Sequence, residues 1–126
     1  MVVLMRYLLG TFALVTFAGL TGADAPVQNT SADEAQIVEI TAERFSFTPS
    51  EVRTKAGTRL EIRLKSEDTA HGFHIVGTDV DIELPKRGRG VITVSFVPKA
   101  VGRYTFECSQ LCGAGHEFMR GVIIAE

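Results

Sequence analysis

Two thiols, an imidazole and a thioether lie close together in the sequence, at Cys108, Cys112, His116 and Met119. These side chains are ligands for a soft or borderline metal ion, and copper suits all three types. Two glycines between the second thiol and the imidazole let the backbone fold tightly, so that the side chains can return toward one point. The segment therefore predicts a copper site.

The second cysteine bears on the kind of copper site. A mononuclear blue copper site uses one Cys, two His and a weak axial Met, so Cys108 and Cys112 supply one thiol more than it needs. Two thiolates can each bridge two metal ions, which predicts a compact pair of coppers. If one imidazole caps each copper, His116 needs a partner, and only His71 and His74 remain. An odd separation in an extended strand points these two to opposite faces, so only one of them can face the metal.

The same residues also fit three simpler kinds of site. Cys108 and Cys112 can form a structural disulfide, because exported proteins favour such bonds. The segment can instead hold a single copper ion, as in a mononuclear copper carrier, although the second thiol argues against that site. A third alternative is a copper-delivery protein, whose labile centre would lose the metal quickly to a mild chelator.

Alternating apolar and polar residues predict the strands that must position these side chains. The alternation is clearest in Thr58–Ser66 and recurs in Val91–Val97 and Arg103–Cys108. Shorter candidate strands are Gln36–Thr41, Gly72–Val76, Val80–Leu84 and Gly121–Ala125. Turns rich in Gly and Pro separate the strands, and no stretch after Ala25 has a convincing helical period. This pattern predicts an all-β domain, a Greek-key sandwich or barrel.

The N-terminal residues differ from the rest of the chain. Residues 1–25 contain an early arginine, an apolar stretch at Tyr7–Leu20, and an A-x-A arrangement at Ala23 and Ala25, which are the regions of a secretory signal. The apolar stretch is shorter than the ~20 residues that span a bilayer comfortably. We expect a signal peptide or N-terminal membrane anchor at 1–25, a linker at 26–36 and the domain at 37–126. The domain is then periplasmic or on the outer face of the cytoplasmic membrane.

The charge and the polar residues exclude several functions. With 13 basic and 15 acidic residues the net charge is −2, so the chain lacks the basic character of a nucleic-acid partner. No hydrolytic or nucleophilic constellation is present, so no catalysis is expected from this chain alone. The acidic run Asp79–Glu83 is expected to be a solvated face, with steering of a basic partner as the alternative.

The metal-binding pattern resembles a known family. The spacing C-x-x-x-C-x-x-x-H-x-x-M, preceded by DTAHGFH at 68–74, is similar to the CuA domain of cytochrome c oxidase subunit II, and most similar to that of the ba3-type oxidases. The resemblance runs from about Ile37 to Glu126 and includes FTPSEV at 47–52 and GRYTFEC at 102–108. It implies a cupredoxin-like fold and a dinuclear copper (CuA) centre.

The resemblance also implies which residues bind the metal. The two cysteines would bridge both coppers, and each of two histidines would ligate one copper. A thioether would be a weak ligand of one copper, and a glutamine backbone carbonyl a ligand of the other. The implied ligands are His71, Cys108, Gln110, Cys112, His116 and Met119. His74 matches a histidine that is not a ligand in the family.

The function implied by the resemblance is electron transfer. The domain would accept single electrons from a c-type cytochrome and pass them to a haem–copper oxidase or another reductase. Two forms of the protein fit this function. One is a free electron carrier, and the other is subunit II of a cytochrome c oxidase, where it would be the point of electron entry.

Overall fold

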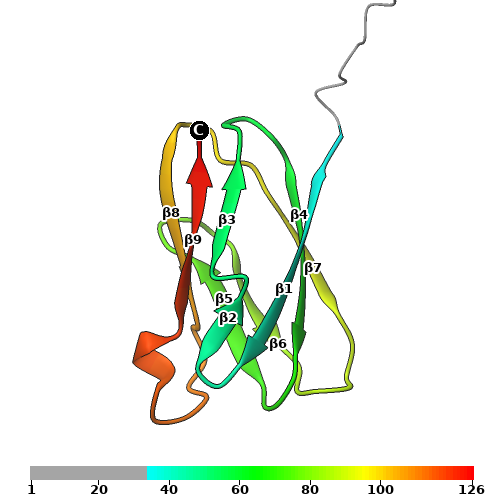
Figure 1. The fold of residues 1–126 in the computed structure, drawn as a ribbon. Coiled ribbons are helices and arrows are strands. Elements are labelled where there is room, and N and C mark those ends of the chain that lie inside the picture. The colour runs from blue at the N-terminus through cyan, green and yellow to red at the C-terminus, as the bar shows by residue number, and fades with distance from the viewer. Residues whose placement is uncertain (1–33) are drawn as a thin grey trace, which may run out of the picture.

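The computed structural model describes residues 34–126, which form two β-sheets packed face to face (Figure 1). The four-stranded sheet has the order β2-β1-β4-β7 and the five-stranded sheet the order β3-β9-β8-β5-β6. The strands of the first sheet are β1 (Gln36–Glu43), β2 (Ser46–Thr48), β4 (Leu60–Ser66) and β7 (Ile92–Phe96). Those of the second are β3 (Glu51–Thr54), β5 (His71–Ile75), β6 (Asp81–Leu84), β8 (Gly102–Glu107) and β9 (Arg120–Ala125).

The connections of the sandwich cross repeatedly from one sheet to the other. Strand β1 pairs in parallel with β4, and β3 pairs in parallel with β9, so strands distant in sequence lie side by side. The hairpin partners β5 and β6, and β8 and β9, pair antiparallel. The prediction of an all-β Greek-key sandwich is confirmed by this arrangement.

Strand β4 shows why the alternation in the sequence predicted the layers. Leu60, Ile62 and Leu64 are fully buried between the sheets, while the charged residues between them face outward. Successive side chains of a strand point to opposite faces, so an alternating sequence can bury one face only. The predicted strands around residues 58–66, 91–97 and 103–108 are all present.

Two strands of the structure were not predicted from the sequence. Strands β2 and β3 are only three and four residues long, so their alternation is too short to recognise. Their apolar residues, Phe47 and Val52, are nevertheless buried. Pairing with β1 and β9 therefore decides that these short segments are strands.

An aromatic cluster joins the two sheets. The ring of Phe47 in β2 contacts the rings of Phe73 in β5 and Phe106 in β8 edge-on, with centroids 5.8 and 5.3 Å apart. The rings of Phe73 and Phe106 are 5.1 Å apart. His71 precedes Phe73 by two residues and Cys108 follows Phe106 by two, so each shares the inward face of its phenylalanine. The cluster thus packs beneath the predicted metal ligands.

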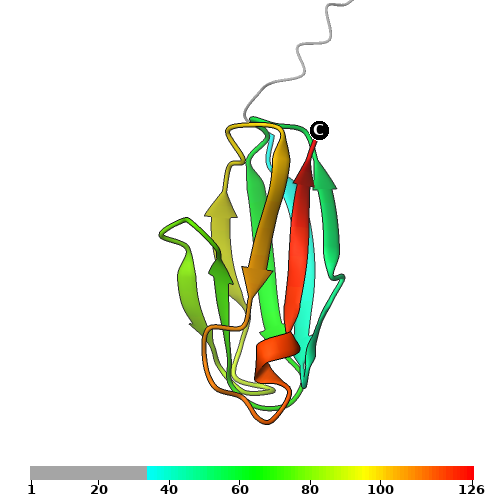
Figure 2. The same cartoon turned by 90° about the vertical axis from the view of Figure 1, so that its left-hand side faces the viewer.

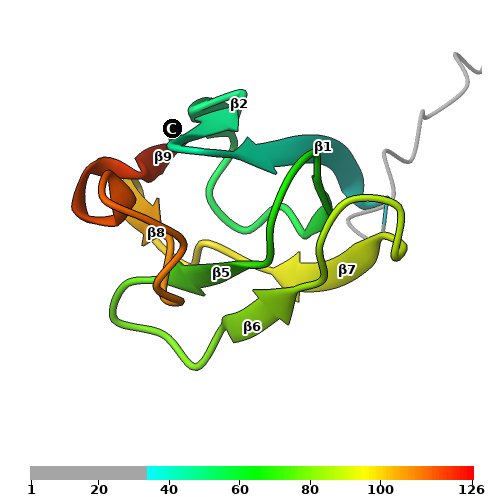
Figure 3. The same ribbon diagram turned by 90° about the horizontal axis from the view of Figure 1, so that it is seen from below.

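The predicted ligands gather at one end of the sandwich. The connection from β8 to β9, residues 108–119, is here called the ligand loop, and it contains a single 3₁₀ turn, His116–Phe118. It lies at the end opposite the C-terminus (Figure 2), and Figure 3 looks onto this end. Within residues 34–126 no helix has the length and apolarity needed to span a membrane. The predicted signal or anchor at 1–25 lies outside the described residues.

Candidate metal centre

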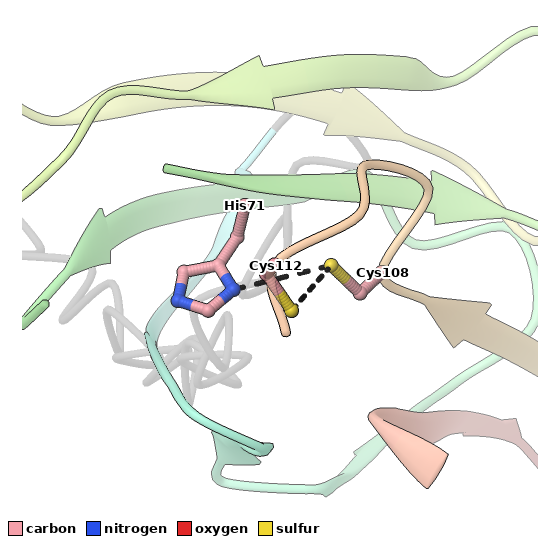
Figure 4. Close-up of side chains that lie close together, drawn as sticks. All are labelled: His71, Cys108 and Cys112. Carbon is pink, nitrogen blue, oxygen red and sulfur yellow. Dashed lines mark hydrogen bonds between the residues drawn. The ribbon is translucent and has the colours of Figure 1, made fainter. Parts of the chain in front are cut away.

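Three predicted ligands from two distant segments meet at this end. The donor atoms of His71, Cys108 and Cys112 all lie within 4.8 Å of one another, and the three side chains are buried (Figure 4). His71 begins β5 and Cys108 directly follows β8, and these strands are hydrogen-bonded neighbours. The pairing of β5 with β8 therefore brings the imidazole beside the thiols.

The two thiols are close but unjoined. Their Sγ atoms are 3.7 Å apart, well beyond the ~2.05 Å of a disulfide bond, and both cysteines are free. The Nδ1 atom of His71 lies 3.9 Å from the Sγ of Cys108. The structural disulfide that the sequence allowed is therefore absent from this structure.

The remaining predicted ligands surround the same two sulfur atoms. The Sγ of Cys112 lies 3.8 Å from Nδ1 of His116 and 3.9 Å from Sδ of Met119. The thiol of Cys108 donates a hydrogen bond of 3.1 Å to the backbone carbonyl of Gln110. Met119 has no exposed surface. The four other predicted ligand groups thus each lie within 4 Å of one of the two sulfur atoms.

A carboxylate orients the imidazole of His71. Its Nε2 atom lies 2.7 Å from Oδ1 of Asp68, which leaves Nδ1 directed at Cys108. A carboxylate contact of this kind sets the tautomer and orientation of a ligating histidine. Partial burial acts to raise the pKa of the Asp68 carboxyl. Hydrogen bonds from His71 and from the backbone N–H groups of Arg44 and Thr69 outweigh burial, so this pKa lies below its usual value.

His74 is turned away from the thiols. Its Nδ1 atom lies 3.0 Å from the carbonyl oxygen of Val80, and across the sheet it faces Asp81 and Glu107. His71 is fully buried, whereas His74 is only partly buried. The structure therefore brings one histidine of the pair to the thiols, as the odd spacing in a strand requires.

Two neighbours of the ligand loop were missed in the sequence. The guanidinium Nε of Arg44 donates a hydrogen bond of 2.8 Å to the carbonyl of Cys112. The ring of Phe45 packs on two glycines, so closely that a Cβ on Gly113 or Gly115 would lie 2.9 or 2.3 Å from a ring carbon. Gly113 also has a φ of +146°, which L side chains rarely adopt. Arg44 and Phe45 belong to no motif, so no local signal connects them with the loop.

The environment of the thiols keeps Cys112 protonated in the metal-free protein. Burial, together with the hydrogen bond and the charge of Cys108, raises the pKa of the Cys112 thiol to about 11. A metal ion binds the thiolate, so it must displace this proton.

The donor set fits copper. Two thiols, two imidazoles and a thioether are soft or borderline donors, and the buried site offers no carboxylate among them to favour a hard ion. A surface hollow of about 340 Å³ is lined by Cys108 and His116, with Glu107, Glu117 and Arg120 around it. The site is thus buried in the sandwich but reachable from one side.

Comparison with known proteins gives a family for the whole fold. The sequence model of the Cupredoxin-like domain family matches residues 10–125. Cytochrome c oxidase subunit 2 of Thermus thermophilus is 34% identical over 90 residues, which cover 71% of this chain. The match spans 64% of the relative's length, so the chain corresponds to less than two thirds of that protein.

Solved structures are similar as well. A chain in the cryo-electron microscopy structure of a haem–copper terminal oxidase dimer has a TM-score of 0.68 and 25% identity, with coverage of 90% of this chain and 78% of that chain. The periplasmic domain of subunit II of cytochrome oxidase of Bradyrhizobium japonicum has a TM-score of 0.64 and 18% identity, with coverage of 71% and 83%. The second likeness concerns the fold alone.

Proposed function

The chain belongs to the family of cupredoxin-like domains, and from that premise we propose that it transfers single electrons through a dinuclear copper (CuA) centre. The six ligand groups are the side chains of His71, Cys108, Cys112, His116 and Met119, and the backbone carbonyl of Gln110. In this proposal both cysteines would hold the pair of coppers, and each imidazole would hold one copper.

One observation carries the proposal. Two buried, unjoined thiols lie 3.7 Å apart, and each has a histidine Nδ1 atom within 4 Å, at 3.9 Å for Cys108 and 3.8 Å for Cys112. A blue copper site needs only one thiolate. Such a site already uses two imidazoles, so the second thiol is the donor that supports two metal ions rather than one.

The chain's own residues hold the donors in place and exclude water. Copper, when bound, supplies one-electron redox chemistry. His71 and Met119 have no exposed surface, and Cys108 and Cys112 are each 5% exposed. His71 lies at the start of β5, and the ligand loop is attached to β8 and β9. These strands hold the ligands in place, so the ligands need little rearrangement when the oxidation state of the copper changes.

The proposed partners follow from the relatives and the surface of the ligand loop. We take a c-type cytochrome as the donor and a haem–copper oxidase or another reductase as the acceptor. The Thermus relative is named as a subunit of cytochrome c oxidase, and the Bradyrhizobium domain is described as periplasmic. Leu111 and Phe118 of the loop are 82% and 81% exposed, which offers an apolar contact beside the site. Electron-transfer encounters use small, transient interfaces of this kind.

Metal analysis and electron paramagnetic resonance test the dinuclear centre. We expect two coppers per chain and, in the oxidised protein, a hyperfine pattern from one unpaired electron shared by two copper nuclei. Both thiols should be protected from alkylation after loading. One copper per chain with a single-nucleus spectrum would refute the proposal and favour a mononuclear carrier.

Variants of the ligand loop sharpen this test. Cys112→Ser and Cys108→Ser should each reduce loading to one copper at most. Ser109→Ala is the matched control, because Ser109 lies in the same loop and its hydroxyl bonds to Asp81 rather than to a thiol. Rapid loss of copper from the unaltered protein to a mild chelator would instead identify a copper-delivery protein.

The second candidate is that the chain transfers electrons as a subunit of an oxidase rather than as a free carrier. The similarity to an oxidase subunit supports it. Purification from the native membrane under mild conditions separates the two forms. An oxidase subunit should co-purify with a haem–copper protein, whereas a free carrier should purify without haem.

A further inference from the structure

Arg44 contacts both segments that supply the predicted ligands. It lies between β1 and β2, far in sequence from either segment. Its backbone N–H donates a hydrogen bond of 2.8 Å to Oδ2 of Asp68, and its side-chain Nε donates one of 2.8 Å to the carbonyl of Cys112. Arg44 thus forms hydrogen bonds both with Asp68, which precedes β5, and with Cys112 in the ligand loop.

One of these hydrogen bonds is made to a residue that contacts a predicted ligand, and the other is made to a predicted ligand residue. The other carboxylate oxygen of Asp68 lies 2.7 Å from Nε2 of His71 and sets the direction of that ring. The carbonyl bonded by the guanidinium belongs to Cys112 itself. The positions of the imidazole and the thiol are therefore linked through Arg44, although the two residues lie 41 positions apart in the chain (112 − 71).

The next residue supports the same loop by packing. The ring of Phe45 fills the space over Gly113 and Gly115, where a Cβ would lie 2.9 and 2.3 Å from its carbons. The loop between the last thiol and the second imidazole therefore rests on the β1–β2 turn. This turn supports the loop both by a hydrogen bond at Cys112 and by packing on the residues that follow it.

We infer that Arg44 is a positioning residue that sets the placement of Cys112 relative to His71, and so prepares the site before copper binds. This inference rests on the proposed function, because it concerns the same copper centre. The hydrogen bonds of Arg44 reach the Asp68 carboxylate and the Cys112 carbonyl, and neither group is a predicted donor. Arg44 acts through these two groups, and contacts of this kind typically change metal affinity about 10- to 100-fold.

The side chain is tested with Arg44→Met, which keeps the backbone N–H bond to Asp68 but removes the bond to Cys112. Arg44→Lys keeps the charge and a donor, and serves as the conservative variant. The control is Arg53→Met, because Arg53 is also an exposed arginine but pairs with Glu51 and Glu126, away from the loop.

We expect Arg44→Met to fold normally, to bind copper about 10- to 100-fold more weakly in chelator competition, with faster release, and to shift the reduction potential. Arg44→Lys should restore part of the slower release, and Arg53→Met should behave like the unaltered protein. Equal release rates and potentials in the unaltered protein and Arg44→Met would overturn the inference. An equal change in Arg53→Met would also overturn it, since the effect would then be one of general surface charge.

A double-mutant cycle tests whether Arg44 joins the two segments. Asp68→Asn removes the carboxylate that Arg44 shares with His71, and residues of one network have non-additive effects. The loss of copper affinity in Arg44→Met/Asp68→Asn should therefore differ from the sum of the single losses. Additive losses would contradict the inference, because the two contacts would then act separately.

A measurement without copper separates this inference from the proposed function. In the copper-free protein, amide hydrogen exchange of residues 109–115 should be faster in Arg44→Met than in the unaltered protein or Arg53→Met. Unchanged exchange there contradicts the inference even if two coppers bind. Faster exchange supports it even if the unaltered protein binds one copper.

Discussion

His71 and His74 have the same chemistry but different surroundings. His71 is buried between Asp68 and Cys108, whereas His74 bonds the carbonyl of Val80 on the outer face. At the residue scale, the direction of a side chain from its strand therefore decides which imidazole can serve the metal.

The first prediction compares substitutions of these two histidines. If the proposed dinuclear centre forms, His71→Ala should remove at least one copper, because it deletes an imidazole next to the thiols. His74→Ala should leave both coppers in place. Metal content and the visible spectrum of the loaded proteins measure the difference. An equal loss of copper in both variants would contradict the assignment.

Met119 should tune the centre rather than hold it together. Its Sδ lies 3.9 Å from the Sγ of Cys112, and the side chain is fully buried. Leu has nearly the same volume, so Met119→Leu should cost less than about 1.5 kcal/mol of folding free energy. The variant should keep both coppers and change the reduction potential, because a thioether is a weak ligand. Voltammetry with metal analysis tests this, and loss of all copper would show that the role is wrong.

The protonated thiol of Cys112 predicts a pH dependence of copper uptake. Its pKa of about 11 means that, below this pH, bound metal must displace the thiol proton. Proton release therefore opposes binding more strongly as the pH falls, and this proton alone lowers affinity on the order of tenfold per pH unit. The effect should vanish above about pH 11. A pH indicator present during anaerobic loading measures the protons released, and Cys112→Ser should release fewer.

At the scale of elements, the ligand loop depends on the β1–β2 turn. Strands β8 and β9 bring its two ends together, and the N–H of Cys108 donates a hydrogen bond of 3.1 Å to the carbonyl of Met119. Between these ends the loop contacts Arg44 and Phe45. The loop is therefore closed by its own strands and supported by a turn of the other sheet.

A substitution in the loop tests that support. A Cβ at position 115 would lie 2.3 Å from Cδ2 of Phe45, so Gly115→Ala must displace the ring or the loop. We expect a loss of about 1–3 kcal/mol in folding free energy and weaker copper retention, measured by denaturant unfolding and chelator competition. In a Phe45→Ala background the same change should cost much less. A cost that does not depend on the side chain at position 45 would show that the clash is not the cause.

At the scale of the whole molecule, the sandwich separates the copper site from the C-terminus. The aromatic cluster of Phe47, Phe73 and Phe106 joins both sheets below the site. The apolar loop residues and the hollow beside His116 lie at the ligand end. Electron partners are therefore expected to approach this end of the molecule.

For the whole molecule, we predict that the protein is exported from the cytoplasm. The arginine, apolar stretch and small residues of 1–25 are typical of a secretory signal or an anchor. A reporter that is active only outside the cytoplasm, fused at the C-terminus, should be active in cells. Fractionation then distinguishes a cleaved, periplasmic form from a membrane-bound form. An inactive reporter, with the intact fusion found in the cytoplasm, would contradict export.

The sequence by itself determined the nature of the donors and the layers of the fold. The thiols, the second imidazole and the thioether lie in one short segment, so their spacing alone predicts that they meet. Alternation in strands such as β4 predicts a buried face, because the side-chain period of a strand is a local property. Ligand spacing and strand alternation each involve only a few neighbouring residues, so both can be recognised before the fold is known.

The family resemblance named His71 as a ligand, but only the tertiary structure decided how distant residues reach and support the site. The register of β5 on β8, with His74 opposite Glu107, places His71 level with the ligand loop and turns His74 outward. The contacts of Arg44 and Phe45 with the loop, and the short strands β2 and β3, also depend on pairing between segments far apart in the chain. Such contacts leave no periodic trace in the sequence, because they are set by strand register and packing rather than by neighbouring residues.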